Sequence, residues 1–234
     1  MHNGLTLYQE ERVLTTLELI ALIVIFVLTS AVGVITGSTS LITVPVLLQY
    51  GMEPRTALAT NMFALTFMSV GGALPFFRNG SIDRRRLPPL IILTIAGSVV
   101  GALLVLIIPT RALPLIISVS MIAVAIFTLA HRNAGVIPEG GAPRAAEITG
   151  YMVTFALGIY GGFFSGGYIT LLTAAYVALF RMTFVEAVGI TKLINVFSSL
   201  VATIIFIYQG LVDYRLGLIL GAAMFVGGIA GAYE

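Results

Sequence analysis

Seven long apolar stretches follow one another along this chain, at residues 17–35, 57–77, 87–108, 112–130, 148–164, 184–208 and 216–232. About 20 apolar residues in an α-helix cross a bilayer core, so each stretch predicts a membrane-spanning helix. Charged residues make up only 9% of the 234 residues, against about 25% in an average soluble domain. The chain is therefore predicted to be an all-α, polytopic membrane protein.

The same composition excludes several other classes of protein. Nucleic-acid binding and intrinsic disorder both require charged or polar stretches that this chain lacks. Disulfides, thiolate metal sites and redox pairs are excluded because the sequence contains no cysteine. We expect no cofactor, no metal site and no nucleic-acid partner, and we expect the spans to contact the lipid bilayer. His2 and His131 both lie outside the predicted spans.

Two further apolar segments, 41–50 and 168–180, are too short to span a bilayer. The first follows residues 36–40 (Thr-Gly-Ser-Thr-Ser), and the second follows residues 161–167 (Gly-Gly-Phe-Phe-Ser-Gly-Gly). We call these runs the first and second interruptions. A long helix, a break of small residues and a short helix together predict discontinuous or re-entrant half-helices that begin at membrane depth.

The chain also contains an internal repeat. Moving it by 130 residues without a gap superposes residues 51–104 on 181–234 with twelve identities. Two spaced motifs recur in this register, namely Gly80-x-x-Asp83-x-Arg85 with Gly210-x-x-Asp213-x-Arg215, and Gly97-x-x-x-Gly101 with Gly227-x-x-x-Gly231. We predict two duplicated repeats of about three or four spans each. The span 112–130 has no counterpart, so we expect a final helix to be missing from the second repeat.

This repeat divides the chain into four parts. They are an N-terminal polar segment (1–16), a first transmembrane repeat (17–130), a linker (131–147) and a second transmembrane repeat (148–234). The linker is polar and contains two prolines and two glycines. The N-terminal segment lacks the basic start and short apolar core of a secretory signal, so we predict no cleaved peptide.

The arginines indicate an orientation in the membrane. Arg78, Arg84, Arg85 and Arg86 cluster between two spans, and the positive-inside rule places such a cluster in the cytoplasm. If each half-helix re-enters and returns to the same side, the N-terminus is cytoplasmic as well, and we favour this arrangement. If the half-helices complete a crossing instead, the two repeats become inverted.

Lys192 is the only lysine in the chain, and it lies inside the span 184–208. Asn195 shares its helix face, and Thr191 lies beside it. Ionisable groups within a membrane typically mark substrate or ion pathways, although a lysine that reaches the headgroups would produce the same pattern. We favour a pathway. The matching part of the first repeat offers Thr60 and Asn61.

Glu186 lies three residues after Thr183, which is the spacing of a capping box at the start of a helix. We expect this structural role. A carboxylate that carries a coupling proton is the alternative.

The two interruptions supply the second polar feature. A half-helix that begins at membrane depth presents unpaired N–H groups and the positive end of its dipole. The residues before the two starts are Ser38, Thr39 and Ser40 in the first interruption and Ser165, Gly166 and Gly167 in the second. With Lys192, these starts predict a cavity that binds an anion. Tight helix crossing at the glycines is the alternative, and it is the reading we prefer for the Gly-x-x-x-Gly motifs.

These residues resemble the TauE/SafE sulfite-exporter family of prokaryotic membrane transporters. The similar features are the first interruption followed by Val44-Pro45, the paired Gly-x-x-Asp motifs, and Thr191-Lys192-x-x-Asn195. The resemblance implies a duplicated four-helix unit that moves sulfite or a small organosulfur anion, such as an organosulfonate, across the cytoplasmic membrane. It also implies pathway roles for Thr60, Asn61, Thr191, Lys192 and Asn195.

We therefore expect a multi-pass secondary transporter, an exporter of a small anion, in the cytoplasmic membrane of a prokaryote. It would alternate access around a site at the bilayer midplane. The sequence has no nucleotide-binding loop of the Gly-x-x-x-x-Gly-Lys type, so an ion gradient, with a proton as one candidate, or facilitated flow would drive transport. The alternatives are an intramembrane serine hydrolase that pairs Ser165 with Lys192 and an anion channel. The sequence leaves the oligomeric state open.

Overall fold

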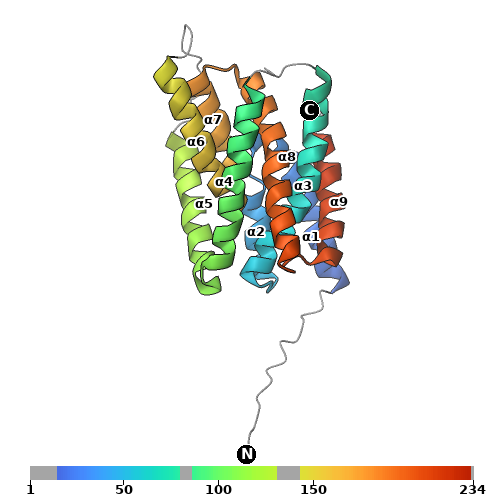
Figure 1. Cartoon of the computed structure of the whole chain (residues 1–234). Helices are drawn as coiled ribbons and strands as arrows, with labels where there is room; N and C mark the ends of the chain where they lie inside the picture. Colours follow the sequence, from blue (N-terminus) through green and yellow to red (C-terminus); the bar gives the residue numbers. More distant parts are fainter. Residues whose placement is uncertain (1–14, 80–85, 131–142, 233–234) are drawn as a thin grey trace, which may run out of the picture.

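The computed structural model describes residues 15–79, 86–130 and 143–232. In these residues the chain forms a bundle of nine α-helices and one 3₁₀ turn, with no strand (Figure 1). The helices are α1 (Thr16–Thr36), α2 (Ser40–Gln49), α3 (Pro54–Asn79), α4 (Leu87–Ile107), α5 (Leu113–Ala130), α6 (Arg144–Phe163), α7 (Tyr168–Phe180), α8 (Phe184–Tyr208) and α9 (Tyr214–Ala232). The 3₁₀ turn, Thr110–Ala112, leads directly into α5. The predicted all-α membrane fold is confirmed.

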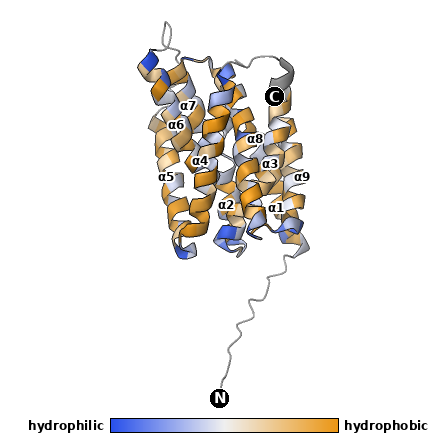
Figure 2. Cartoon of the chain, in the orientation of Figure 1, coloured by the Kyte–Doolittle hydropathy of each residue, from blue (hydrophilic) through white to orange (hydrophobic). Residues whose placement is uncertain are grey.

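Six segments of the described chain are long and apolar enough to cross a membrane: α1, α3, α4, α8, α9, and α5 together with its 3₁₀ turn. The sides of the bundle are apolar, and hydrophilic residues gather at its two ends (Figure 2). The seventh expected span, α6, is not among the six. Apart from Phe163, its buried face consists of glycines and Thr154 in place of large aliphatic side chains, which lowers its hydropathy.

Both predicted breaks in the helices are present. α1 ends at Thr36, and Gly37 follows in the left-handed region with φ of 74°. α6 ends at Phe163, and Ser165 (φ 64°) and Gly167 (φ 74°) both lie in that region before α7 begins. The short helices α2 and α7 therefore start in the interior of the bundle, with 10 and 13 residues.

Hydrogen bonds show which helix ends lie together. At the lower end in Figure 1, Arg55 near the start of α3 donates to the carbonyl of Ile108 after α4 (2.9 Å). At the upper end, Arg86 before α4 donates to the carbonyl of Phe180 at the end of α7 (3.1 Å) and to Glu147 in α6 (2.8 Å). The helix pair α6–α7 therefore enters the bundle from the upper end and returns to it.

Glycine seams confirm the predicted close packing. A Cβ on Gly97 or Gly101 of α4 would collide with the backbone of α6, and a Cβ on Gly227 or Gly231 of α9 would collide with the backbone of α1. Small residues let two helix backbones approach this closely. Since α4 belongs to the first predicted repeat and α6 to the second, whereas α9 belongs to the second and α1 to the first, the two halves interlock.

The helix directions correct the arrangement that the arginines favoured. α1 runs parallel to α9, and α6 runs parallel to α4, because successive glycines along one helix contact successive turns of its partner. The pair α4 and α6 runs in the direction opposite to that of α1 and α9 (Figure 1). The pair α1–α2 thus enters from the lower end and α6–α7 from the upper end (Figure 1). Each half-helix returns to the end from which its pair entered, and the two pairs enter from opposite ends, so the two halves are inverted.

The arginine bias weakens with this inversion. Among the described residues, the helix ends at the upper end carry Arg78, Arg86, Arg144 and Arg181, and those at the lower end carry Arg55, Arg111 and Arg215. A difference this small is a weak guide to orientation under the positive-inside rule.

Some predictions fall on other parts of the chain. Residues 80–85, which include Asp83 and Arg85, residues 131–142 of the expected linker, and residues 1–14 of the expected N-terminal segment lie outside the described residues. α6 begins at Arg144, which is inside the range 131–147 assigned to the linker.

Candidate functional site

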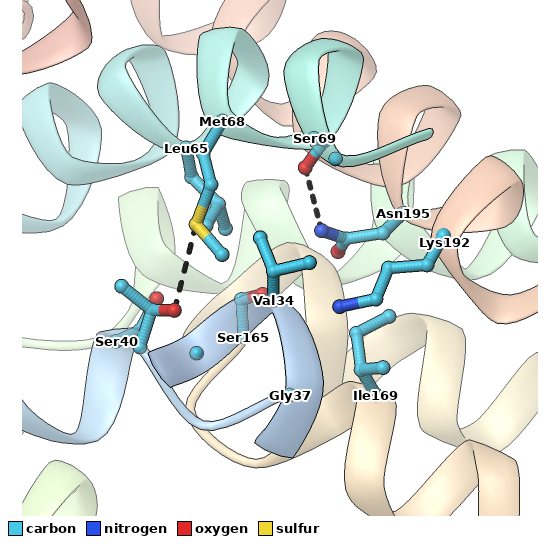
Figure 3. Close-up of a pocket in the computed structure, with 13 residues that line it drawn as sticks. Val34, Gly37, Ser40, Leu65, Met68, Ser69, Ser165, Ile169, Lys192 and Asn195 are labelled. Carbon is cyan, nitrogen blue, oxygen red and sulfur yellow. Dashed lines mark hydrogen bonds between the residues drawn. The ribbon is translucent and has the colours of Figure 1, made fainter. Parts of the chain in front are cut away.

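A cavity lies where the two interruptions meet (Figure 3). Gly37, Thr39 and Ser40 line it from the first interruption, and Ser165 lines it from the second. The free space for the centre of a water-sized sphere is about 20 Å³, and about 10–15 Å³ of such space suffices for one water molecule. In this conformation the cavity is therefore narrow, with room for about one water molecule.

Lys192 of α8 points into this cavity. Its side chain is only 5% exposed, and its amine is directed toward the interruptions (Figure 3). Within the described residues Lys192 forms no hydrogen bond and no ion pair. The buried position rules out the alternative in which this lysine reaches the headgroups.

Asn195 lies one turn further along α8 and also lines the cavity, with 6% of its surface exposed. Its Nδ2 donates a 2.6 Å hydrogen bond to Ser69 Oγ of α3 (Figure 3). Its Oδ1 is buried and has no partner among the described residues. A buried oxygen without a hydrogen-bond partner costs about 1–3 kcal/mol. A ligand that donates a hydrogen bond to Asn195 Oδ1 would remove this cost.

The half-helices differ from the long helices in how they begin. α1 and α8 begin with complete capping boxes, in which Thr15 pairs with Glu18 and Thr183 with Glu186. Neither α2 nor α7 has a side-chain cap within the described residues. Backbone carbonyls of the interruptions accept hydrogen bonds from several of their first-turn N–H groups instead, namely Leu41 to Ser38 (3.1 Å), Ile42 to Thr39 (3.0 Å) and Tyr168 to Ser165 (3.2 Å). The capping role expected for Glu186 is confirmed.

Two residues predicted to bind substrate tie helices together instead. Asn61 of α3 accepts a 2.6 Å hydrogen bond from Thr43 and donates one of 3.0 Å to Ser40, both in α2. The hydroxyl oxygen of Thr191 in α8 lies 3.0 Å from that of Thr173 in α7, and the Thr191 hydroxyl donates to the Val188 carbonyl. Neither lines the cavity, although Asn61 holds Ser40, which does.

Four other predicted residues also lie away from the cavity lining. Thr60 accepts a 3.1 Å hydrogen bond from the amide of Asp213. The Gly166 carbonyl accepts one from the Tyr160 hydroxyl, Gly167 packs against Val124 of α5, and Ser38 lies 3.2 Å from the hydroxyl of Thr170. The structure therefore brings together Thr39, Ser40, Ser165, Lys192 and Asn195 of the predicted set.

Sequence reasoning missed the apolar part of the lining. Val34, Leu65, Met68 and Ile169 also line the cavity (Figure 3). Nothing in the pattern separates these side chains from the many others that face lipid or the core. Ser69 carries a weak signal as one of the few polar residues of α3, but lone serines in membrane helices are usually packing residues.

The cavity also bears on the other chemistries considered. Among the described residues no group of three or more histidine, aspartate or glutamate side chains comes together. Ser165 and Lys192 both line the cavity, but no hydrogen bond joins them in the described part of the chain.

The sequence model of the family described as "Sulfite exporter TauE/SafE" matches residues 22–233. The chain belongs to the TauE/SafE sulfite exporter family. Relatives of this TauE/SafE chain include a probable membrane transporter protein, ORF9, of Sinorhizobium sp, 29% identical over 85% of this chain and 76% of the relative. A probable membrane transporter protein of Haemophilus influenzae is 28% identical over 87% of this chain and 79% of the relative. The probable membrane transporter protein YfcA of Escherichia coli K12 is 28% identical over 85% of this chain and 73% of the relative.

No solved structure matches this TauE/SafE chain. Membership of the TauE/SafE family, together with six helices of membrane-spanning length, identifies a multi-pass membrane transporter.

Proposed function

We propose that the chain is a secondary transporter that exports sulfite, or a small organosulfur oxyanion such as an organosulfonate, across the cytoplasmic membrane of a prokaryote. One observation carries the proposal: Lys192 is buried and unpaired within the described residues, in a cavity where both interruptions converge.

The cavity favours an anion for electrostatic reasons. A lysine near the centre of a membrane helix costs about 2.5–3.5 kcal/mol, and a bound anion would offset that cost. The uncapped first turns of α2 and α7 add the positive ends of two helix dipoles. Thr39, Ser40 and Ser165 add hydroxyl donors from the interruptions. Oxygen atoms of a small oxyanion satisfy all three kinds of group.

The arrangement of the halves supports alternating access. Two inverted halves that meet at a central site are common in secondary transporters. The cavity here has only about 20 Å³ of free space for the centre of a water-sized sphere, enough for roughly one water molecule. A substrate would therefore enter only after the walls of the cavity move apart.

The decisive experiment replaces the amine. Purified protein in proteoliposomes should take up or release labelled sulfite, and Lys192→Met should reduce the initial rate. A hydrogen bond to a charged group contributes about 1.5–3 kcal/mol, so apparent affinity should fall by about ten- to a hundredfold. Lys192→Arg should retain part of the activity because it keeps a cationic donor.

A matched control uses Thr66→Val. Thr66 is a polar residue of α3 that lies 3.2 Å from the Thr203 hydroxyl and does not line the cavity. This variant should transport at the rate of the unmodified protein. Undiminished sulfite flux in Lys192→Met, with normal folding, would remove the lysine from the mechanism.

A thermal-shift panel addresses the substrate. Sulfite, sulfate, thiosulfate and small sulfonates should each be tested for a rise in the melting temperature of the purified protein, since a ligand that binds only the folded state stabilises it. Lys192→Met should abolish any such rise. A panel without effect would contradict the oxyanion assignment, and electrical conductance without saturation would indicate a channel.

A further inference from the structure

The first interruption contacts the first turn of α7 directly through hydrogen bonds among three residues. Thr170, in the first turn of α7, donates a hydrogen bond from Oγ1 to the carbonyl oxygen of Thr36 at the end of α1. The hydroxyl oxygens of Thr170 and Ser38 lie 3.2 Å apart, and Ser38 also donates to the Thr36 carbonyl (3.4 Å). We call Thr36, Ser38 and Thr170 the latch. The last carbonyls of α1 lack hydrogen-bond donors within the helix. In the latch, Thr170 of the opposite half supplies a donor for the Thr36 carbonyl.

Close packing of the backbones accompanies the latch. Gly37 has φ of 74°, and a Cβ built on it would lie 2.7 Å from Ile169 Cβ and 2.8 Å from the Thr170 nitrogen. Only glycine permits this approach without a shift of α7. The first interruption therefore rests on the first turn of α7 through both hydrogen bonds and van der Waals contact.

The latch is the outer layer of the cavity wall. Gly37, Thr39 and Ile169, which are sequence neighbours of the latch residues, are buried and line the cavity. Thr36 itself is exposed, and Ser38 and Thr170 are half-buried. Separation of the two interruptions at the latch would thus open the cavity on this side.

We propose that Thr170 is a positioning residue that holds the first interruption against the start of α7 in this conformation, and that the latch separates during each transport cycle. This inference rests on the proposed transport function. It assigns a role to a residue outside the predicted pathway set, because Thr170 joins the two inverted halves and does not itself line the cavity.

Other hydroxyl pairs near the cavity have a different place in the fold. Thr43 with Asn61 (2.6 Å) and Thr173 with Thr191 (3.0 Å) each join a half-helix to the long helix that follows it. These pairs are buried and lie within one half of the chain. A movement of α7 away from the first interruption would separate the latch but leave these pairs together.

A disulfide test separates these two kinds of contact. The sequence contains no cysteine, so every introduced thiol is unique. Ser38→Cys with Thr170→Cys places two thiols where hydroxyl oxygens are 3.2 Å apart, and Thr173→Cys with Thr191→Cys provides a control pair whose hydroxyls are 3.0 Å apart. Both pairs are oxidised in proteoliposomes with copper phenanthroline, and cross-linking is verified by mass spectrometry.

Oxidation of the latch pair should abolish sulfite flux, and dithiothreitol should restore it. Oxidation of the control pair should leave most of the flux. Full flux through a cross-linked latch pair would overturn the inference, and so would failure of the latch pair to cross-link. Absence of flux in the unmodified protein would instead contradict the proposed function.

A second measurement needs no transported substrate. Ser165→Cys places a thiol in the cavity, where N-ethylmaleimide should react slowly in the closed conformation. Adding Thr170→Val should accelerate this labelling severalfold because the latch loses its donor, whereas Thr170→Ser should restore the slow rate. Equal labelling rates in all three proteins would exclude a latch at Thr170, whichever solute the protein carries.

Discussion

Gly37 and Gly167 lie 130 residues apart and share the same left-handed backbone, with φ of 74° at each. The first ends α1, and the second precedes α7. Neighbouring side chains occupy the space where a Cβ would stand, namely Ile169 beside Gly37 and Val124 beside Gly167. Each interruption thus depends on a glycine for two reasons, the backbone angle and the lack of a side chain.

Replacement of these glycines separates the two reasons. Gly210 also has a positive φ, 65°, but a Cβ there would meet nothing within 4 Å. Gly210→Ala should lower the free energy of unfolding by only about 1–2 kcal/mol, the cost of a left-handed alanine. Gly37→Ala and Gly167→Ala should lose about 1–3 kcal/mol more through overpacking. Thermal unfolding in detergent measures all three, and equal losses would show that the contacts contribute nothing.

Asn61 provides a test of positioning against binding. Asn61→Leu should lower the free energy of unfolding by about 1–3 kcal/mol, because the buried Ser40 hydroxyl loses its donor and the Thr43 hydroxyl keeps only the Thr39 carbonyl as an acceptor. The rise in melting temperature with sulfite should persist, since Asn61 does not line the cavity. Asn195→Leu is the matched variant on the cavity wall. If Asn61→Leu rather than Asn195→Leu removed the ligand response, direct binding by Asn61 would be indicated.

Glu186 can be tested with a single isosteric change. Its Oε2 accepts hydrogen bonds of 2.8 Å from both the amide and the hydroxyl of Thr183. Glu186→Gln keeps an oxygen acceptor, so we expect stability to change by less than about 1 kcal/mol and the dependence of flux on a proton gradient to remain. Loss of that dependence, with normal folding, would make Glu186 the coupling carboxylate. Thr183→Ala, which removes the cap alone, is the control and should cost about 1 kcal/mol.

Arg86 joins three helices at the upper end of the bundle. It donates to Glu147 and to the Phe180 carbonyl, and its guanidinium lies 5.6 Å from the centre of the Phe180 ring. Arg86→Gln should lower the free energy of unfolding by about 1 kcal/mol, a modest value because both side chains of the ion pair are about one-third exposed. Glu147→Gln should cost less, since it leaves the carbonyl bond intact. High salt should reduce the effect of Glu147→Gln measured by thermal unfolding, and an effect independent of salt would argue against an ion pair.

The internal duplication stays a prediction, but several structural relationships follow its spacing. Thr43 and Asn61 form their hydrogen bond across 18 residues, and Thr173 and Thr191, which occupy the same register positions, form theirs across 18 residues as well. The register is not followed in the cavity, where Lys192 corresponds to Met62 and Asn195 to Leu65. Lys192 and Asn195 of the site therefore come from the second copy alone, although each copy contributes hydroxyl groups.

Sequence reasoning worked best where the signal is local. The capping box of Thr183 and Glu186 and the discontinuities at residues 36–40 and 161–167 depend on consecutive residues, and both were predicted. The roles of Asn61 and Thr191 were less accessible. A polar side chain inside a span must bond to something, but only packing determines whether its partner is a ligand or another helix.

Taken alone, the amino-acid order determined the number and type of the helices, the two interruptions and the unusual place of Lys192, because apolar length, helix caps and glycine breaks are properties of short segments. Only the tertiary structure decided that the halves are inverted and interlocked, and that Lys192, Asn195 and both interruptions share one cavity. Those features depend on contacts between residues more than a hundred positions apart, such as Thr36 with Thr170. Such contacts arise from the fit of helix surfaces, which no local pattern encodes.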